Sequence, residues 1–245
     1  MRQILEEIIK EWQNWQLPEI KTRDTDLTTY FDKKIKKIIS VIGFRRVGKT
    51  FLLFDLAKKI GQKNCLYLNL EDERLPKKTE VLTHFIDLVK ELTNNQKLVL
   101  LIDEIQNIPD WSRWARRINE TSDYFLIITG SSSKLSSFEI PTQLRGRTIS
   151  VKLNPLNFRE FLNFKEEQID LISKNRQLNL LREYLTFGGL PEIVLTETGK
   201  KHLIIEEYFR TFLTRDIFER YGLRQKEAFR ALIRILLNSS YLTVS

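Results

Sequence analysis

Residues 43–50 read Gly43-Phe44-Arg45-Arg46-Val47-Gly48-Lys49-Thr50, a pattern of glycine, four residues, then glycine-lysine-threonine. The apolar run Ile38–Ile42 comes directly before this stretch, and a helical pattern over Thr50–Lys59 follows it. Glycines let such a loop turn so that backbone N–H groups converge at the positive end of the next helix, where anions bind. This setting predicts a phosphate-binding loop. The alternative, a glycine-rich turn with an exposed lysine, fits it less well.

Two side chains of this loop have chemistry suited to a nucleoside triphosphate. The Lys49 ammonium would neutralise charge on the β- and γ-phosphates, and the Thr50 hydroxyl would complete the coordination of Mg²⁺. The sequence therefore predicts binding of a nucleotide with Mg²⁺.

A second motif, Leu98-Val99-Leu100-Leu101-Ile102-Asp103-Glu104, is an apolar run that ends in two carboxylates. If the run is a parallel strand, Asp103 faces the phosphate loop and holds Mg²⁺, directly or through water. Glu104 then orients and deprotonates the attacking water. The alternative is that both acids simply open the next loop.

Other nucleotide-binding classes fit less well. The sequence lacks the Asn-Lys-x-Asp motif that reads guanine and the Leu-Ser-Gly-Gly signature of transporter ATPases. Small-molecule kinases do not usually place Asp-Glu at the end of such a strand. We therefore expect ATP to be the nucleotide.

The order of apolar runs predicts a doubly wound α/β fold. Five short, β-branched runs read as buried parallel strands: Ile38–Ile42, Leu66–Leu70, Leu98–Ile102, Phe125–Thr129 and Thr148–Leu153. Helical patterns separate them at Thr50–Lys59, Thr79–Leu92 and Trp111–Asn119. Alternating strands and helices imply right-handed crossovers and a parallel five-stranded sheet.

Four regions follow from these patterns. We expect an amphipathic helix and linker over residues 1–29, a P-loop ATPase domain over 30–157, a helical lid over 158–222 and the start of a winged-helix region over 223–245. Because the chain stops within an apolar phrase, we expect the full-length protein to continue.

Composition narrows the cellular setting. The formal charge of +8 favours polyanionic partners without choosing among them. The single cysteine, Cys65, lies in an apolar run and is expected to pack in the core, which fits a reducing cytoplasm. No signal peptide or membrane-spanning run is apparent, so we expect a cytoplasmic protein.

The motifs together resemble a known family. GFRRVGKT, LLIDEIQNIPDW, ITGSSS, QLRGR, LNPLNFREF and FGGLPEIVL, in this order, resemble the prokaryotic AAA-type ATPases of the AAA+ superfamily. The resemblance implies the P-loop division with an additional strand and a catalytic glutamate. It also implies kinship to signalling ATPases and, often, a following winged-helix region and a C-terminal domain of unknown function.

The resemblance also implies roles for individual residues. Ser131 would sense the γ-phosphate, unless it belongs to a serine-rich surface loop. Arg147, or else Arg145, would be an arginine finger acting on a neighbouring subunit, unless these arginines cap the strand or pair with acids. Pro191 would contact adenine from the lid while Gly188 and Gly189 let the lid approach the base, unless Gly-Gly-Leu-Pro only stops a helix.

Some assignments are looser. Arg23-Asp24 resembles a segment near the base, Asn69 would either restrain Glu104 or satisfy backbone groups, and Arg215 is a weak candidate for a second sensor. The predicted nucleotide-binding residues are Gly43, Phe44, Arg45, Arg46, Val47, Gly48, Lys49, Thr50, Phe51 and Pro191. The predicted catalytic residues are Lys49, Glu104, Ser131 and Arg147, and the predicted magnesium ligands are Thr50 and Asp103.

Three functions from different classes remain open. The first is an ATPase whose hydrolysis of ATP drives a conformational change. Such an ATPase would self-associate, because an arginine finger acts on the site of a neighbouring subunit. The second is a switch that binds ATP or ADP tightly with negligible turnover. The third is a nucleotide-regulated DNA-binding protein that uses the basic helical patterns Phe209–Arg220 and Lys226–Leu237.

Overall fold

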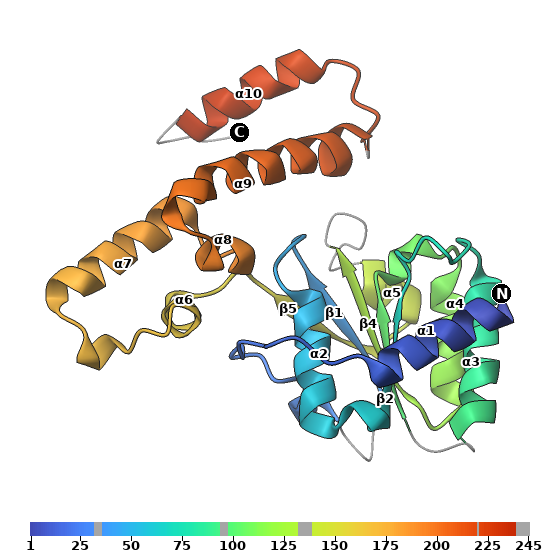
Figure 1. The fold of residues 1–245 in the computed structure, drawn as a ribbon. Helices are drawn as coiled ribbons and strands as arrows, with labels where there is room; N and C mark the ends of the chain where they lie inside the picture. The colour runs from blue at the N-terminus through green and yellow to red at the C-terminus, as the bar shows by residue number, and fades with distance from the viewer. Residues whose placement is uncertain (32–35, 94–97, 132–138, 220, 239–245) are drawn as a thin grey trace. The chain divides into compact units, whose positions relative to one another are not determined.

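The described residues between Arg2 and Leu153 form a parallel β-sheet with helices packed against it (Figure 1). A computed structural model describes residues 1–31, 36–93, 98–131, 139–219 and 221–238. The strands are β1 (Ile38–Gly43), β2 (Cys65–Asn69), β3 (Val99–Asp103), β4 (Phe125–Ser131) and β5 (Thr148–Leu153). All neighbours run parallel in the order β2-β3-β4-β1-β5. The predicted α/β fold is confirmed, and each strand lies within a residue or two of its predicted position.

The helices of the sheet domain are α1 (Arg2–Asn14), α2 (Lys49–Ile60), α3 (Thr79–Thr93), α4 (Trp111–Thr121) and α5 (Glu139–Leu144). Three of them, α2 to α4, occupy the predicted crossovers; α1 is the predicted N-terminal helix, and α5 was not predicted. Every residue of β1 is buried, as a central strand covered on both faces requires. The apolar runs of β1 and β3 therefore reflect burial on both faces of the sheet. The prediction of a buried strand is wrong for β5, which lies at the edge of the sheet and leaves Ile149, Ser150 and Lys152 exposed.

The strand register brings the polar ends of four strands to one edge. Asn69 at the end of β2 is paired with Asp103 at the end of β3, and Gly43 at the end of β1 is paired with Ser131 at the end of β4. Because β4 lies between β1 and β3, its last residues lie beside both the start of the phosphate loop and Asp103. Carboxyl ends of parallel strands are the usual place for ligands in such sheets.

The helix α1 packs against β2 and α3 through its apolar face. Its Trp12 is 3% exposed, and the indole Nε1 donates a hydrogen bond to the Cys65 carbonyl at 3.0 Å. The Trp12 ring also lies 5.3 Å from the Tyr67 ring, centroid to centroid. The amphipathic N-terminal helix predicted from the sequence is thus an integral part of the core.

Residue Cys65 is buried, as predicted, and its burial raises the pKa of the thiol to about 12. A thiol with such a pKa stays protonated and unreactive at neutral pH.

Beyond the sheet the chain is helical. It continues through α6 (Phe158–Phe164), α7 (Lys174–Phe187) and α8 (Pro191–Leu195), which form a small apolar cluster of their own around Phe161. By its contacts the chain divides after Leu195, so these three helices belong to the same compact unit as the sheet. The four domains expected from the sequence, with limits at residues 157 and 222, stay a prediction.

The second compact unit begins at Thr196 and contains α9 (Thr198–Thr211), a π-helical stretch η5 (Phe212–Glu219) and α10 (Lys226–Asn238). Arg215, the weak candidate for a second sensor, lies on the π-helical stretch with its side chain exposed. No helix in the described part of the chain combines the length and the apolar character needed to cross a membrane.

We expect Trp12→Ala to lower the free energy of unfolding by about 3–5 kcal/mol, because it removes a buried aromatic side chain and leaves a cavity under α1. Urea denaturation followed by circular dichroism measures this change. The control is Trp15→Ala, since Trp15 is 42% exposed and should cost about 1 kcal/mol or less. Equal losses in the two variants would contradict the placement of α1.

Candidate nucleotide site

The phosphate loop joins β1 to α2 and starts where two strands come very close. A Cβ atom added to Gly43 would lie 2.4 Å from the Leu153 carbonyl oxygen of β5. Only glycine fits this approach without moving the backbone, so the first glycine of the motif fixes where the loop leaves the sheet.

The Lys49 side chain is drawn back over the loop. It is 5% exposed, and its Nζ donates hydrogen bonds to the Gly43 and Phe44 carbonyls at 3.3 and 3.2 Å. Burial lowers the pKa of Lys49, while the nearby carboxylates of Glu104 and Asp103 oppose that shift. Weak neutral carbonyl partners leave this cation ready to pair with a stronger acceptor such as a phosphate oxygen.

The Asp103 carboxylate is the most buried acid of the site, at 1% exposure. Its Oδ2 accepts hydrogen bonds from Thr50 Oγ1 at 2.6 Å and from the Tyr67 hydroxyl at 2.9 Å, and its Oδ1 accepts one from Thr129 Oγ1. Burial, and then the charge of Asp103, raise the pKa of Tyr67, so this hydroxyl stays protonated and donates. The predicted pair Thr50 and Asp103 is thus in direct contact.

Residue Glu104 follows in a left-handed backbone conformation with φ of 53°. Its N–H donates to Thr129 Oγ1 at 3.1 Å, and its Oε2 accepts a hydrogen bond from Gln106 Nε2. Burial raises the pKa of Glu104, whereas Gln106 and Lys49 oppose that shift. A non-glycine residue in this conformation is a feature often kept at functional sites.

The restraint of Glu104 comes from Gln106 rather than from Asn69. The side-chain Oδ1 of Asn69 accepts a hydrogen bond from the backbone N–H of Glu71 at 2.9 Å. Of the two roles considered for Asn69, the structure therefore favours the satisfaction of backbone groups.

The predicted sensor, Ser131, lies at the edge of the sheet where the carboxyl ends of the strands meet, as expected. Ser131 ends β4 opposite Gly43, but its side chain lies outside the described part of the structure. The hydroxyl that contacts Asp103 and the Glu104 N–H belongs to Thr129, two residues earlier on the same face of the strand.

The predicted finger arginine lies at the opposite edge. Arg147 precedes β5, whose first residue Thr148 is paired with Ile38 at the start of β1. Its Nε donates to Glu120 Oε1 of α4 at 2.5 Å. Six strand residues span roughly 20 Å, so Arg147 does not reach the phosphate loop of its own chain. Arg145 is exposed, with φ of 49°.

The start of α8 lies over the phosphate loop. A Cβ atom on Gly48 would lie 3.7 Å from Pro191 Cγ, and Arg46 pairs with Glu192 at 3.3 Å. Pro191 is therefore beside the predicted nucleotide site, as expected for a lid residue. The side chains of Phe44 and Phe51 are both exposed around the loop.

Gly189, two residues before Pro191, has a reason within the fold, while the predicted role of Gly188 stays a prediction. A Cβ atom on Gly189 would lie 2.2 Å from the Leu156 carbonyl oxygen, and the Gly189 carbonyl accepts a hydrogen bond from Leu156 N at 2.7 Å. Gly189 thus allows close packing of two backbone segments of the helical region, and its approach is to Leu156 rather than to a base.

The residues present fit Mg²⁺ bound together with a nucleotide. In the described residues no group of three or more His, Cys, Asp or Glu side chains could hold a metal ion by itself. Magnesium in nucleotide sites, however, takes one or two protein oxygens and completes its shell with phosphates and water. The hydroxyl of Thr50 and the carboxylate of Asp103, 2.6 Å apart, are oxygen donors of that kind.

Sequence reasoning missed Tyr67 and Gln106, and it named Thr129 without choosing it. A tyrosine inside an apolar strand usually finds a hydrogen-bond partner for its hydroxyl, and this was the available signal for Tyr67. Gln106 gives no such signal, because only the turn after β3 brings it back to Glu104.

Three relatives of this chain are described as uncharacterized proteins. Two proteins of Methanocaldococcus jannaschii are 38% identical over 208 residues and 29% identical over 188 residues, and one of Haemophilus influenzae is 30% identical over 236 residues. The matches cover 82%, 72% and 93% of this chain, but 46%, 39% and 55% of these relatives. The chain therefore spans about half the length of the curated relatives that it matches.

Two family models match the chain in succession. Residues 178–242 match a domain of unknown function. The model described as an AAA domain matches residues 35–162, which include every strand, the phosphate loop and the acidic end of β3. This match covers more than half of the 245 residues, and the chain belongs to the AAA domain family.

Proposed function

We propose that this chain binds ATP with Mg²⁺ and hydrolyses it, and that hydrolysis drives a conformational change of the helical region. The observation that carries the proposal is the convergence of Lys49, Thr50, Asp103 and Glu104 at one edge of the sheet. Thr50 and Thr129 both donate hydrogen bonds to the Asp103 carboxylate, and the backbone N–H of Glu104 donates to the Thr129 hydroxyl. Such a constellation serves phosphoryl transfer, where positioning and charge stabilisation supply nearly all of the catalysis.

Each residue has a distinct task in this proposal. The loop N–H groups bind the phosphates, and Lys49 exchanges its two backbone carbonyl partners for phosphate oxygens. Thr50 and Asp103 would hold Mg²⁺, which supplies charge neutralisation at the transferred phosphoryl group. Glu104 accepts the proton of the attacking water, with one carboxylate oxygen oriented by Gln106.

Contacts of α8 support the coupling to a conformational change. Glu192 forms an ion pair with Arg46 of the phosphate loop, and Pro191 lies next to Gly48 of the same loop. A nucleotide that rearranges this loop would therefore alter the packing of α8. Lid movements of this kind commonly follow nucleotide binding.

A slow switch is the second candidate, because Glu104 is hydrogen-bonded to Gln106 and buried. The rate of turnover distinguishes the two functions. Self-association, a winged-helix continuation and DNA binding by the C-terminal helices stay predictions.

We expect Lys49→Ala to abolish detectable ATP binding, a loss of about 100-fold or more, because it removes a charge-assisted contact to the phosphates. Titration of a fluorescent ATP analogue, confirmed by calorimetry, measures the affinity. The control is Lys58→Ala, which removes an exposed lysine from the same helix. Unchanged affinity in Lys49→Ala would remove the loop from nucleotide binding.

We expect Glu104→Gln to keep ATP affinity and to slow phosphate release by about 100-fold or more, because the amide cannot accept the proton of the attacking water. Phosphate release from Mg-ATP at several protein concentrations measures turnover. Glu73→Gln, an exposed acid near β2, is the matched control. Equal turnover in wild type and Glu104→Gln would exclude Glu104, and tight binding without turnover in both would favour the switch.

A finger acting between subunits predicts complementation. We expect Arg147→Ala to be inactive alone, and a mixture with Glu104→Gln to regain turnover, because one variant supplies the glutamate and the other the arginine. Glu120→Gln separates this role from the ion pair, since it frees Arg147 without removing it. Absence of recovery at any mixing ratio would leave Arg147 as a surface partner of Glu120.

A further inference from the structure

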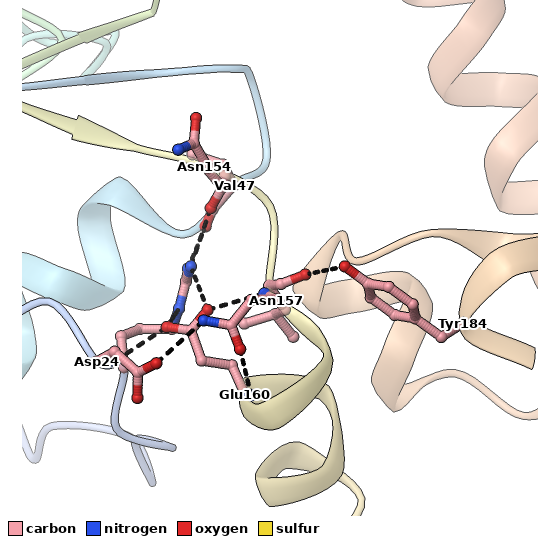
Figure 2. A network of polar contacts seen from close by, with 8 residues as sticks. Asp24, Val47, Asn154, Asn157, Glu160 and Tyr184 are labelled. Atoms are coloured by element: carbon pink, nitrogen blue, oxygen red, sulfur yellow. Dashed lines mark hydrogen bonds and ion pairs between the residues drawn. The ribbon is translucent and has the colours of Figure 1, made fainter. Parts of the chain in front are cut away.

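The segment between α1 and β1 sends one arginine into the phosphate loop. The Arg23 side chain is 9% exposed, and its guanidinium makes four hydrogen bonds. Nη1 donates to the Val47 carbonyl of the loop at 3.1 Å, and Nη2 donates to the Asn154 carbonyl at 2.9 Å. Nε and Nη2 donate to the two carboxylate oxygens of Glu160 at 2.7 and 3.1 Å. Figure 2 shows this network.

The partner acid, Glu160, sits in the first turn of α6 and is 4% exposed. It also accepts backbone hydrogen bonds from Asp24 N at 2.9 Å and Asn157 N at 3.0 Å. Burial raises the pKa of Glu160, but Arg23 and these two N–H groups outweigh it and hold the pKa below its ordinary value. The Glu160 carboxylate is therefore charged, and its pairing with the Arg23 guanidinium consists of charge-assisted hydrogen bonds.

The network continues into the helical region. Asn157 caps α6 through Glu160 N at 2.9 Å, and the adjacent Leu156 carbonyl accepts a hydrogen bond from the Tyr184 hydroxyl of α7 at 2.9 Å. Leu156 N donates to the Gly189 carbonyl at 2.7 Å, two residues before Pro191. An unbroken path of short contacts thus joins a carbonyl of the phosphate loop to α6, α7 and the start of α8.

A buried ion pair of this kind is a poor source of stability, because desolvation of both charges offsets their attraction. The pair does fix the relative positions of its partners, because the planar guanidinium must hydrogen-bond to a carboxylate and to two carbonyls at the same time. Val47 immediately precedes Gly48 and Lys49, whose N–H groups and side chain are placed to receive phosphate. A rotation of the Val47 carbonyl would therefore displace the Arg23 guanidinium and, with it, alter the hydrogen bonds to Glu160.

We propose that Arg23 is a positioning residue that holds the phosphate loop in its binding shape and links nucleotide occupancy to α6 and α7 through Glu160. This proposal rests on nucleotide binding at the loop and adds the route by which occupancy reaches the helical region. Arg23 acts through the Val47 carbonyl, so its contribution is to the loop and the helices rather than to the reacting atoms.

The test uses Arg23→Lys, which keeps the charge but loses the fork, and Glu160→Gln, which keeps the shape but loses the charge. A matched control exists in Lys21, which ties the same segment to the Phe164 carbonyl at 3.0 Å and to Glu166 but makes no contact with the loop. ATP affinity is measured by calorimetry. Hydrogen exchange with and without ATP is followed over residues 43–50 and 156–187.

In the wild type, we expect ATP to slow exchange in both segments. In Arg23→Lys and in Glu160→Gln, we expect the slowing to be confined to residues 43–50 and the ATP affinity to fall about tenfold, a usual size for coupling between sites. The double variant should lose no more affinity than either single variant, because one clamp is broken in all three. Lys21→Ala should behave as the wild type.

Three results would overturn the proposal. If Arg23→Lys keeps the wild-type ATP affinity and ATP still slows hydrogen exchange at residues 156–187, Arg23 does not link the phosphate loop to α6 and α7. Equal effects of Arg23→Lys and Lys21→Ala would reduce Arg23 to a general tether of the N-terminal segment. If the wild type does not bind ATP, both the proposed function and the role of Arg23 are wrong. Calorimetry on the wild type alone shows this before any variant is made. If Arg23→Lys does not fold, Glu160→Gln alone decides between these outcomes.

Discussion

The carboxylate of Asp103 needs hydrogen-bond donors, and much of the site follows from how the fold provides them. An ionised acid at 1% exposure is unstable unless each oxygen has a partner. The donors come from α2 (Thr50), from β2 (Tyr67) and from β4 (Thr129), three elements far apart in the sequence. Satisfying this one group therefore requires the strand order in which β3 lies between β2 and β4. The same arrangement places Glu104 one residue beyond, with its N–H held by Thr129.

The phosphate loop is constrained from both ends. At its start, the close approach of Gly43 to Leu153 sets the point of departure from the sheet. Near its end, the Val47 carbonyl is held by Arg23, and Gly48 lies under Pro191. A loop held in this way loses little further entropy on binding an anion, which is what preorganisation contributes to affinity. The cost is a buried arginine and a buried glutamate, each stable only because the other is present.

The helices α6 to α8 share a small apolar core, the cluster around Phe161. Such a cluster contributes less stability than the core under the sheet, so the helices depend on polar contacts with the loop and the N-terminal segment. Elements of low local stability are the ones that respond when a ligand changes a neighbouring loop. The candidate site thus lies between a sheet with a large core and helices of lower local stability.

Local pattern alone was sufficient for the strands, for the α/β class and for the membership of Lys49, Thr50, Asp103 and Glu104 in one site. Apolar runs covered on both faces, and a glycine motif at a strand-to-helix junction, are properties of short stretches of chain. The partners of these residues could not be predicted in this way. Tyr67, Gln106, Arg23 and Glu160 meet the site only through pairings that span up to 137 residues, and Gly189 is required by a backbone 33 positions earlier rather than by a ligand. The sequence by itself determined which groups are candidates for binding phosphate and magnesium, because that chemistry resides in adjacent residues. Only the tertiary structure decided which side chains orient them, because hydrogen-bond geometry depends on the packing of distant elements.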